Sequence, residues 1–462
     1  MAEPDMVPSK APGTESAGAA ARLAAPELAA HDLIATDAPV GKGYWDLVWG
    51  QFKKNRLAFW SMIFILLLLL TAAWAPVLAL GRPFIWVEDG KTSFPLFQYL
   101  VAPRQSMSVD HLFNYFLFLS LTIPLIVWPV WKLTANRGFP ERVRRKRIWL
   151  SILAACVVAI LPFMNPGSYE RAARPEEQKD GKTTVSEFRF FHRWTLDIRE
   201  YTEERDVLKP ERGDYAIFPP IPYDPELSSS DIRQSPNAKH WLGTDSQGRD
   251  VLGRMLHGGR ISMSVGFVAV SIATILGIII GGLAGYYRGW IDIVVSRFIE
   301  LMICFPTFFL IITIIAMIEE RSVFHIMLIM GLTGWTGVAR LVRGEFLKLT
   351  GQDFVNAARA LGCSSRRVMF RHILPNALGP VLVSTAFGIA GAVLTESGLS
   401  YLGFGAPPPT PTWGEMISQG KLYIDEAWWL MLFPGISIFL TVTVYNLAGD
   451  GLRDAMDPKM RK

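Results

Sequence analysis

The stretch of this chain best suited to a binding task is NAARALGCSSRRVMFRHILPN, at residues 356–376. Its alanines, among them Ala357 and Ala358, favour a helix because alanine has the highest helix propensity. Gly362 is expected to end or bend that helix in the role of a C-terminal cap. A second helix starts at the serine pair that follows, and Pro375 is expected to stop it. The pattern therefore predicts a helix–glycine–helix unit that docks against a partner.

The side chains of this unit suit a protein partner. Small alanines let a groove on the partner close over the backbone, and the arginines can meet acidic residues there. An apolar face is expected on the second helix at Val368, Met369, Ile373 and Leu374. The alternative is a basic loop that only sets topology or touches anionic lipid. The candidate contact residues are Asn356, Ala357, Ala358, Gly362, Arg366, Arg367 and Pro375.

No set of residues in the sequence suggests catalysis. The nearest approach to a phosphate-binding loop is GKTT at 181–184, but Glu176 stands where that motif requires a glycine. The cysteines, Cys156, Cys304 and Cys363, have no spacing that suits a disulfide framework or a metal site. We therefore expect no enzymatic activity, no metal and no cofactor in this chain.

Two acidic residues lie in or near apolar runs, where an ionisable group is a functional candidate by default. Glu300 stands near the cytoplasmic end of its run and can reach water, whereas Glu396 lies near the outer end of another run. Structural hydrogen bonding or a rim position is favoured for both. Asp292 and Arg297, in the short turn before Glu300, are expected to form a local ion pair. Pro306 is expected to kink the helix that contains it.

The elements that position these residues are predicted to be membrane-spanning helices. Half of the residues are hydrophobic (50%) and the mean hydropathy is positive, which together indicate an integral membrane protein. Each apolar run has roughly the 18–25 residues that ~30 Å of hydrocarbon requires. The eight spans are predicted at 57–80, 111–133, 148–165, 261–287, 298–318, 324–342, 377–400 and 429–448. The expected fold class is an all-α integral membrane protein.

The distribution of lysine and arginine predicts the orientation of these spans. Basic residues gather before the first span, at 132–147, at 340–371 and after the last span, whereas the opposite short loops hold few. Both termini are therefore expected in the cytoplasm, together with the 356–376 unit. The first span is too long for a cleaved signal peptide. The Ala- and Pro-rich segment 1–40 that precedes it is expected to be disordered.

Residues 166–255 are then expected on the outer side of the membrane. This segment is polar, carries both charge signs, includes short alternating patches such as VSEFRFF and ends in a proline-rich connector. We expect a small extracytoplasmic subdomain with some strand, and the alternative is a loosely ordered loop.

NAARALG, nine further residues and then HILPN resemble the EAA loop of ABC-importer permeases, the coupling helix that docks into the nucleotide-binding subunit. Asn356 replaces the glutamate of the family pattern and His372 replaces its isoleucine, as in the peptide-importer branch. Further stretches that match this branch lie at 240–266, 284–311, 399–421 and 446–458. The chain resembles the C-type permease of dipeptide and oligopeptide importers. GKTSFPLF, at 90–97, is similar to the subgroup that imports microcin C.

The resemblance implies a six-helix type I importer plan, with the first helix at 57–80 and a core at 261–450 that contains a coupling loop at 351–375. A helix pair at 111–165 is additional to that plan. Alternating access would be driven by ATP hydrolysis in other subunits. The implied partners are a second homologous permease, two ABC ATPase subunits, an extracytoplasmic substrate-binding protein and membrane lipid, without nucleic acid. The implied location is the bacterial inner (plasma) membrane.

Gly277, Gly281 and Gly285 stand at four-residue steps and form a flat stripe where another helix can approach closely. That helix is expected in the partner permease or in a neighbouring span, in preference to a role in the pore lining. Two rival functions remain for the chain. An ion- or proton-coupled secondary transporter needs several ionisable residues at midspan, and a membrane-anchored scaffold would act through residues 166–255.

Overall fold

The computed structural model describes residues 44–81, 83–88, 91–93 and 215–457, the last range without 227, 320 and 409. The chain divides into two units, 1–51 and 52–462, and each is described by itself. In the first unit the described residues form the start of α2 (Tyr44–Lys54). The predicted disordered tail and the two spans predicted at 111–133 and 148–165 lie outside the described residues.

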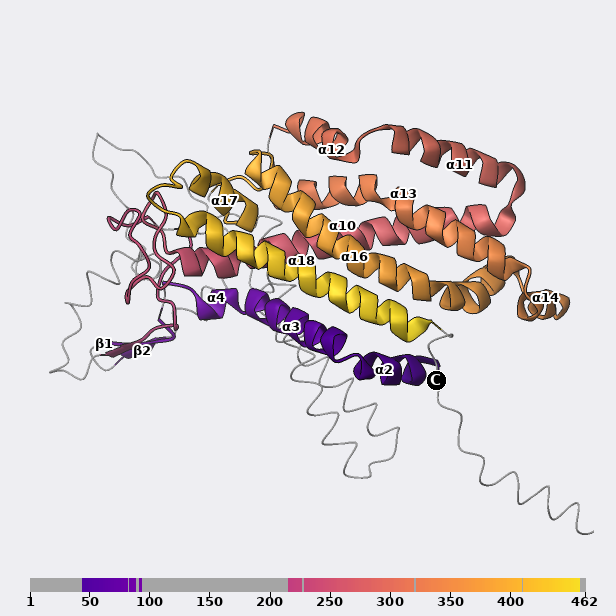
Figure 1. Ribbon diagram of the computed structural model, residues 1–462, viewed down its shortest axis with the longest axis horizontal. Helices are drawn as coiled ribbons and strands as arrows, with labels where there is room; N and C mark the ends of the chain where they lie inside the picture. Colours follow the sequence, from indigo (N-terminus) through magenta and orange to yellow (C-terminus); the bar gives the residue numbers. More distant parts are fainter. Residues whose placement is uncertain are drawn as a thin grey trace, which may run out of the picture. The chain divides into compact units, whose positions relative to one another are not determined.

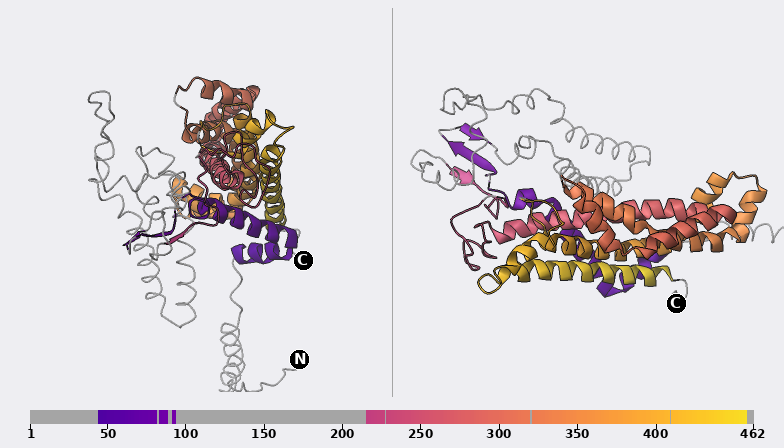
Figure 2. Two further views of the ribbon diagram at one scale, coloured as in Figure 1. Left: turned by 90° about the vertical axis from the view of Figure 1, so that its left-hand side faces the viewer. Right: turned by 90° about the horizontal axis from the view of Figure 1, so that it is seen from above.

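The second unit is a helical bundle (Figures 1 and 2). Its described helices are α3 (Arg56–Ala73), α4 (Ala75–Leu78), α10 (Val251–Tyr287), α11 (Gly289–Cys304), α12 (Thr307–Ala316), α13 (Val323–Thr350), α14 (Asp353–Ala360), α15 (Ser365–Arg367), the π-helix η5 (Val368–Ile373), α16 (Leu374–Tyr401), α17 (Trp413–Lys421) and α18 (Trp429–Met456). Among the described helices, five are long and apolar enough to cross a membrane, and there are six such spans if the bent pair α11–α12 counts as one.

The helices that fall in the described residues match the predicted spans but differ at their ends. α10 begins at Val251 and not at the predicted residue 261. Asp250 caps its start, because its side chain accepts a hydrogen bond from the Gly253 amide at 2.8 Å. Hydropathy missed these first turns because they carry polar side chains, including the buried Arg254. α3 ends at Ala73, earlier than predicted, and the short α4 follows it.

The kink predicted at Pro306 is a break between two helices. α11 ends at Cys304, α12 begins at Thr307, and the two axes differ by 78°. Proline has no amide hydrogen to donate to the preceding turn, and its ring pushes the residue before it out of helical geometry. Phe305 accordingly has extended backbone angles, with φ −87° and ψ 127°.

A small antiparallel sheet accompanies the helical bundle that the fold class predicted. Its strands are β1 (Ile85–Glu88), β2 (Lys91–Ser93) and β3 (Tyr215–Ile217), in the order β2-β1-β3. The register pairs Trp86 with Ser93 and Ile85 with Ile217. β3 lies in the segment 166–255, where some strand was predicted, but it pairs with residues that directly follow the first span.

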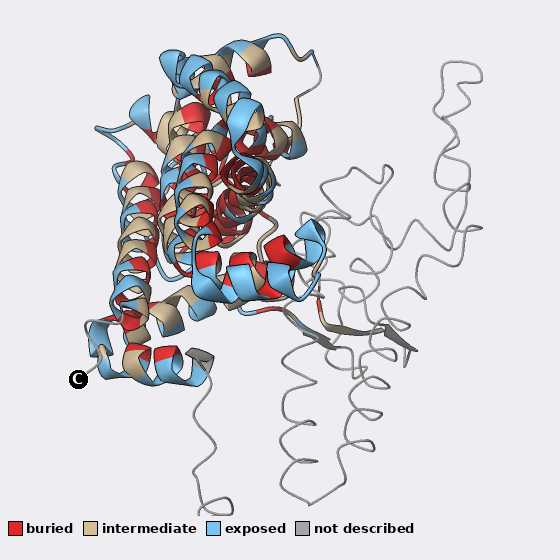
Figure 3. Ribbon diagram, turned by 90° about the vertical axis from the view of Figure 1, so that its right-hand side faces the viewer, coloured by how far each residue is buried: buried red, intermediate tan, exposed pale blue. Residues whose placement is uncertain are grey.

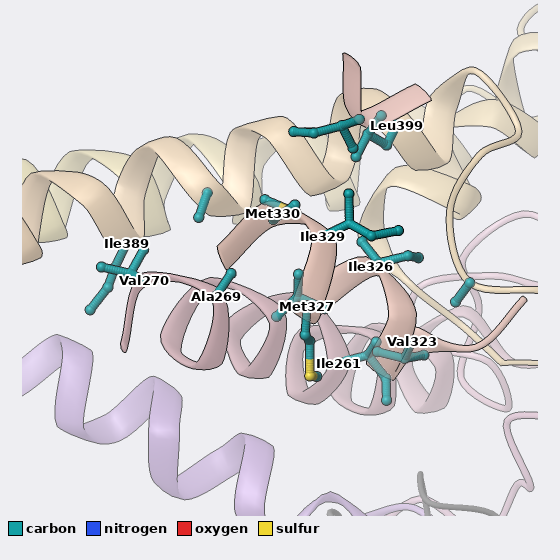
Figure 4. Close-up of a cluster of buried hydrophobic side chains, with 14 of the residues drawn as sticks. Ile261, Ala269, Val270, Val323, Ile326, Met327, Ile329, Met330, Ile389 and Leu399 are labelled. Carbon is teal, nitrogen blue, oxygen red and sulfur yellow. The ribbon is translucent and has the colours of Figure 1, made fainter. Parts of the chain in front are cut away.

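The core of the bundle lies where α10, α13 and α16 meet. One buried apolar cluster joins Ile261 and Ala269 of α10 with Met330 of α13 and Ile389 of α16 (Figure 4). Figure 3 shows buried positions on the faces that the helices turn toward one another and exposed positions on their outer faces. The outer faces of the long helices are apolar, as expected for surfaces that meet lipid or another subunit.

The glycine stripe of α10 lies against α13, a neighbouring span of the same chain. A Cβ added at Gly277 would lie 2.6 Å from the Cβ of Val338, and one at Gly285 would lie 2.7 Å from the carbonyl oxygen of Arg343. A Cβ at Gly281 would overlap the carbonyl group of Ala339. The two backbones therefore approach each other through positions that only glycine can occupy without displacement.

Candidate functional site

The predicted docking unit lies at the end of the bundle opposite α17, where α14 connects α13 to the following helices (Figure 1). α14 has two different faces. Val355 and Ala358 are buried, whereas Phe354, Ala357 and Leu361 are exposed at positions i, i+3 and i+7 of one face. Asn356 and Ala357 are exposed, which leaves the predicted partner contact open to them. Ala358 packs inside its own chain and positions the helix.

Gly362 ends α14 as the sequence predicts. Its φ is +77°, in the left-handed region that glycine adopts without strain. The Gly362 amide donates to the Arg359 carbonyl at 2.9 Å, and the Cys363 amide donates to the Ala358 carbonyl at 3.1 Å. This pair of bonds is the Schellman motif, which satisfies carbonyl groups that the end of the helix would otherwise leave free. The chain therefore reverses sharply at Leu361 and Gly362.

The second part of the unit continues into the membrane-spanning α16. α15 and η5 lead directly to Leu374, so the prediction that Pro375 stops the helix is wrong. Proline is tolerated in the first turn of a helix, because the missing amide hydrogen has no partner there. The apolar face predicted on this helix is confirmed, since Val368, Met369 and Ile373 are buried.

A buried cluster anchors the unit to three long helices. Val355 and Ala358 of α14 and Val368 of η5 belong to the same cluster as Phe346 of α13 and Val381 of α16, with Ile278 and Tyr286 of α10 at its edge. The guanidinium of Arg359 also lies over the ring of Tyr286, 5.2 Å from its centroid. Packed side chains therefore connect α14 with α10, α13 and α16.

The exposed tip of the unit combines apolar and basic side chains. Arg366, Arg367, Gly362 and Pro375 are exposed, as a contact surface requires. The sequence reasoning did not single out Leu361, Phe354 and Phe370, whose side chains are exposed by 85%, 41% and 59%. The periodicity of α14 contains the signal for two of them, because 354, 357 and 361 fall on one face of the helix, beside the face that Val355 and Ala358 bury.

Charged side chains connect helices near the same end of the bundle. The guanidinium of Arg343 in α13 donates to both carboxylate oxygens of Asp292 in α11, one of them at 2.8 Å. Arg297 instead pairs with Glu300 at 2.5 Å. The predicted ion pair between Asp292 and Arg297 is therefore wrong. The bidentate geometry of an arginine and a carboxylate favours the observed contact between the two helices.

Of the two acidic candidates, Glu300 is exposed and Glu396 is buried. The Glu396 side chain, 1% exposed, accepts a hydrogen bond from Ser400 at 2.7 Å. Ser400 in turn accepts one from Thr412 at 3.2 Å, the residue that caps α17. Glu396 is therefore part of the contact between α16 and the start of α17. Glu300 reaches the surface, as predicted for its position near the end of a span.

A second group of charged residues lies at the α17 end of the bundle and was not anticipated from the sequence. Arg254, fully buried at the start of α10, donates to Glu415 of α17 at 2.6 Å and lies 3.3 Å from Asp245. Asp245 also pairs with Arg249 at 2.7 Å. Burial raises the pKa of Glu415, and the nearby guanidinium of Arg254 acts in the opposite direction. Paired charges of this kind fix the loop before α10 against α17.

Two tryptophans strengthen the same contact. The indole N–H of Trp413 donates to the Met255 carbonyl at 3.0 Å, and that of Trp429 donates to the Thr244 carbonyl at 3.1 Å. Both side chains are buried. The segment 240–255 is thus joined to α17 and α18 by hydrogen bonds between residues far apart in the sequence.

Comparisons with known proteins give a consistent assignment. The family described as "Binding-protein-dependent transport system inner membrane component" matches residues 274–462, and "N-terminal TM domain of oligopeptide transport permease C" matches 43–91. The dipeptide transport system permease protein DppC of Alkalihalophilus pseudofirmus is 42% identical over 249 residues, which are 53% of this chain and 82% of that protein.

Two further proteins illustrate the range of the similarity. The glutathione transport system permease protein GsiD of Pectobacterium atrosepticum is 37% identical over 243 residues, 52% of this chain and 80% of that protein. Among solved structures, the MetNI methionine ABC transporter in inward-facing conformations aligns with a TM-score of 0.38 and 18% identity, over 45% of this chain and 97% of that chain.

Proposed function

This chain belongs to the dipeptide and oligopeptide branch of the binding-protein-dependent transport permeases, and from that premise we propose that its cargo consists of peptides or peptide-like compounds. It is a permease subunit of an ABC importer. Relatives named for dipeptide and for glutathione transport support a short peptide as the substrate class. Family membership does not favour an ion-coupled secondary transporter or a membrane-anchored scaffold.

The coupling proposal concerns residues 353–375, which comprise α14 and the chain that leads into α16. One part of this unit is buried in the bundle, and the other part, the exposed tip around Leu361, is accessible. Leu361 projects from the tip, whereas Val355 and Val368 are fully buried in the cluster that joins α13 and α16. Displacement of the tip would therefore move the membrane-spanning helices against which the unit packs, because a packed cluster and not a flexible loop joins them. Closure of two ATPase subunits against this unit would reorient α10, α13 and α16 and so drive alternating access.

The remaining features of the proposed importer follow from this assignment. A second homologous permease, two ABC ATPase subunits and an extracytoplasmic binding protein would complete it in the bacterial inner membrane. Both termini and the 353–375 unit would face the cytoplasm, and residues 166–255 would lie outside. The helix pair predicted at 111–165 would add two crossings to the six of the family plan, in keeping with the basic residues at 132–147.

Substitution of the exposed tip tests the coupling proposal. In the assembled importer, Leu361→Glu is expected to reduce retention of the ATPase subunits during purification by about tenfold or more, because it would place a carboxylate in an apolar contact. ATP-dependent uptake of a labelled peptide is expected to fall in parallel. Ala358→Glu is a poorer test, since its side chain would be forced into the chain's own core.

The matched control is Leu422→Glu. Leu422 is also an exposed leucine, at 76%, and follows α17 at the other end of the bundle (Figure 1). This variant is expected to keep its ATPase subunits. Equal retention of the ATPases by the wild-type protein and by Leu361→Glu would contradict the proposal that this tip docks to them.

A further inference from the structure

A cavity of about 440 Å³ lies between α10, α12, α13 and α16. Its wall includes Ala269 of α10, Thr307 of α12, Gly334 and Gly337 of α13, and Ala392 of α16. Thr307, Gly334 and Gly337 are exposed, so the cavity opens to the surface of the chain. Protein interiors contain few voids much larger than a water molecule. A volume of this size falls instead within the roughly 300–1,000 Å³ of small-molecule sites.

The wall of the cavity is mainly apolar and uncharged. Its side chains are small or apolar, with Phe308 and Met330 as the largest, and none of the described residues that line it is charged. Three hydroxyl groups interrupt the apolar surface, those of Thr307, Ser384 and Thr395. Such a wall favours an uncharged group with a substantial apolar surface, because burial of an unpaired charge there would be costly.

The break between α11 and α12 distinguishes this cavity from a surface that only meets lipid. Thr307 is the first residue of α12, and Pro306 at the cap position has no side chain that could accept from the first amides of that helix. Interrupted helices inside a membrane protein occur where they line a cavity or are covered by protein. A lipid tail offers no acceptor for these amides, whereas the carbonyl groups of a peptide do.

We propose that this cavity is a substrate subsite that receives an uncharged, mainly apolar side chain of a peptide as it passes through the permease. The inference rests on the proposed function, since it takes the cargo to be a peptide. It adds the position of the contact and the class of side chain selected. Apolar contacts with Phe308, Ile311 and Met330 would hold the side chain, and the small residues opposite them would leave the required space.

Filling the cavity from Gly337 tests the proposal. An added Cβ at Gly337 meets no atom within 4 Å, so Gly337→Leu would fill the space without disturbing the packing of its own chain. The importer, reconstituted with its partner subunits, is assayed for ATP-dependent uptake of labelled Ala-Ala and Ala-Phe. Gly337→Leu is expected to lower uptake of Ala-Phe relative to Ala-Ala by about tenfold, the order of discrimination that apolar pockets provide.

Gly391→Leu is the matched control, because Gly391 of α16 also has no atom within 4 Å of an added Cβ but does not line the cavity. The ratio of the two uptake rates is expected to change by less than about twofold in this variant. As an independent measurement, a dipeptide that carries a photoreactive benzoylphenylalanine is expected to cross-link to Met330 or Ile311 in the otherwise unmodified importer.

Several results would overturn the inference. An unchanged uptake ratio in Gly337→Leu, or cross-links confined to other helices, would exclude a substrate side chain from the cavity. Loss of the second permease from Gly337→Leu would show that the partner chain fills the space instead. These outcomes leave the proposed function intact when the wild-type importer still takes up both peptides. Absence of ATP-dependent uptake of either peptide by the wild-type importer would refute the proposed function and the inference together.

Discussion

Gly362 sets the direction in which the tip of the docking unit points. Its φ of +77° lies in the region that costs other L-residues roughly 1–2 kcal/mol. An added Cβ would meet no atom within 4 Å, so backbone conformation and not crowding requires glycine here. The requirement is local, because the two hydrogen bonds of the Schellman motif form within α14 and the residue that follows Gly362.

Replacement of Gly362 isolates this conformational effect. Gly362→Ala is expected to lower the local stability of the unit by about 1 kcal/mol and to speed exchange of the Cys363 amide hydrogen by about fivefold. Gly362→Asn is the control, because asparagine tolerates the left-handed region better than alanine does. Hydrogen exchange followed by mass spectrometry measures both variants. Equal exchange in the alanine variant and the wild type would mean that the positive φ is not required.

The glycine stripe gives α10 and α13 their close packing. Gly277, Gly281 and Gly285 each face the α13 backbone or a side chain close to it, and the glycines come at spacings that place them on one face. Helix propensity would favour alanine at every one of these positions. The glycines are therefore explained by the distance between the helices and not by the conformation of α10.

Alanine at Gly281 should separate the two helices. The added Cβ would overlap the carbonyl group of Ala339, and overpacking of this kind costs about 1–3 kcal/mol, more than the gain of about 1 kcal/mol in propensity. Gly281→Ala is therefore expected to lower the melting temperature of the purified protein in detergent.

Gly344→Ala supplies the matched control on α13, where an added Cβ meets no atom within 4 Å. Here the gain in helix propensity is not opposed by a clash, so the melting temperature is expected to stay the same or to rise. A melting temperature for Gly281→Ala equal to that of Gly344→Ala would contradict the close approach of α10 and α13.

The two ends of the bundle are held together by different means. The 353–375 unit is anchored mainly by buried apolar side chains. The opposite end, where α17 lies, depends on buried charges and indole hydrogen bonds, with Arg254 and Glu415 at their centre. Paired buried charges are sensitive to the loss of either partner.

Loss of one charge from the buried pair should be severe. Glu415→Ala would remove the carboxylate at 2.6 Å and leave Arg254 only Asp245, at 3.3 Å, and loss of a buried partner costs up to about 3–5 kcal/mol. The double replacement Arg254→Met with Glu415→Leu is expected to recover most of that loss, because it removes both buried charges and Asp245 keeps Arg249 at 2.7 Å. Urea or thermal unfolding in detergent compares the stability of the wild type, Glu415→Ala and the double variant. The wild type is expected to be the most stable of the three and Glu415→Ala the least stable.

The surface pair Arg233–Glu426 provides the comparison for this experiment. It also joins the loop before α10 to the segment between α17 and α18, at 2.9 Å, but its side chains are 37% and 63% exposed. Glu426→Ala is expected to cost less than about 1 kcal/mol. A similar cost for Glu415→Ala would show that the buried network does not stabilise this end of the bundle.

Patterns that depend on near neighbours in the chain were predictable. Apolar runs located the described spans, because a helix that faces lipid must be apolar over its full length. The break at Pro306, the cap at Gly362 and the apolar face at Val368 follow from the chemistry of single residues and from helical periodicity. The continuation of the helix through Pro375 was missed, since a proline permits either a stop or a start there.

The sequence by itself determined where the described helices lie and where the helix–glycine–helix unit at 353–375 is formed, because both depend on local composition and spacing. Tertiary structure alone decided that Asp292 pairs with Arg343, that Arg254 lies beside Glu415, that the glycine stripe faces α13, and that four helices line a cavity. Each of these joins residues that are distant in the chain. Their contacts depend on how the helices pack, and periodicity within one helix does not specify its neighbour.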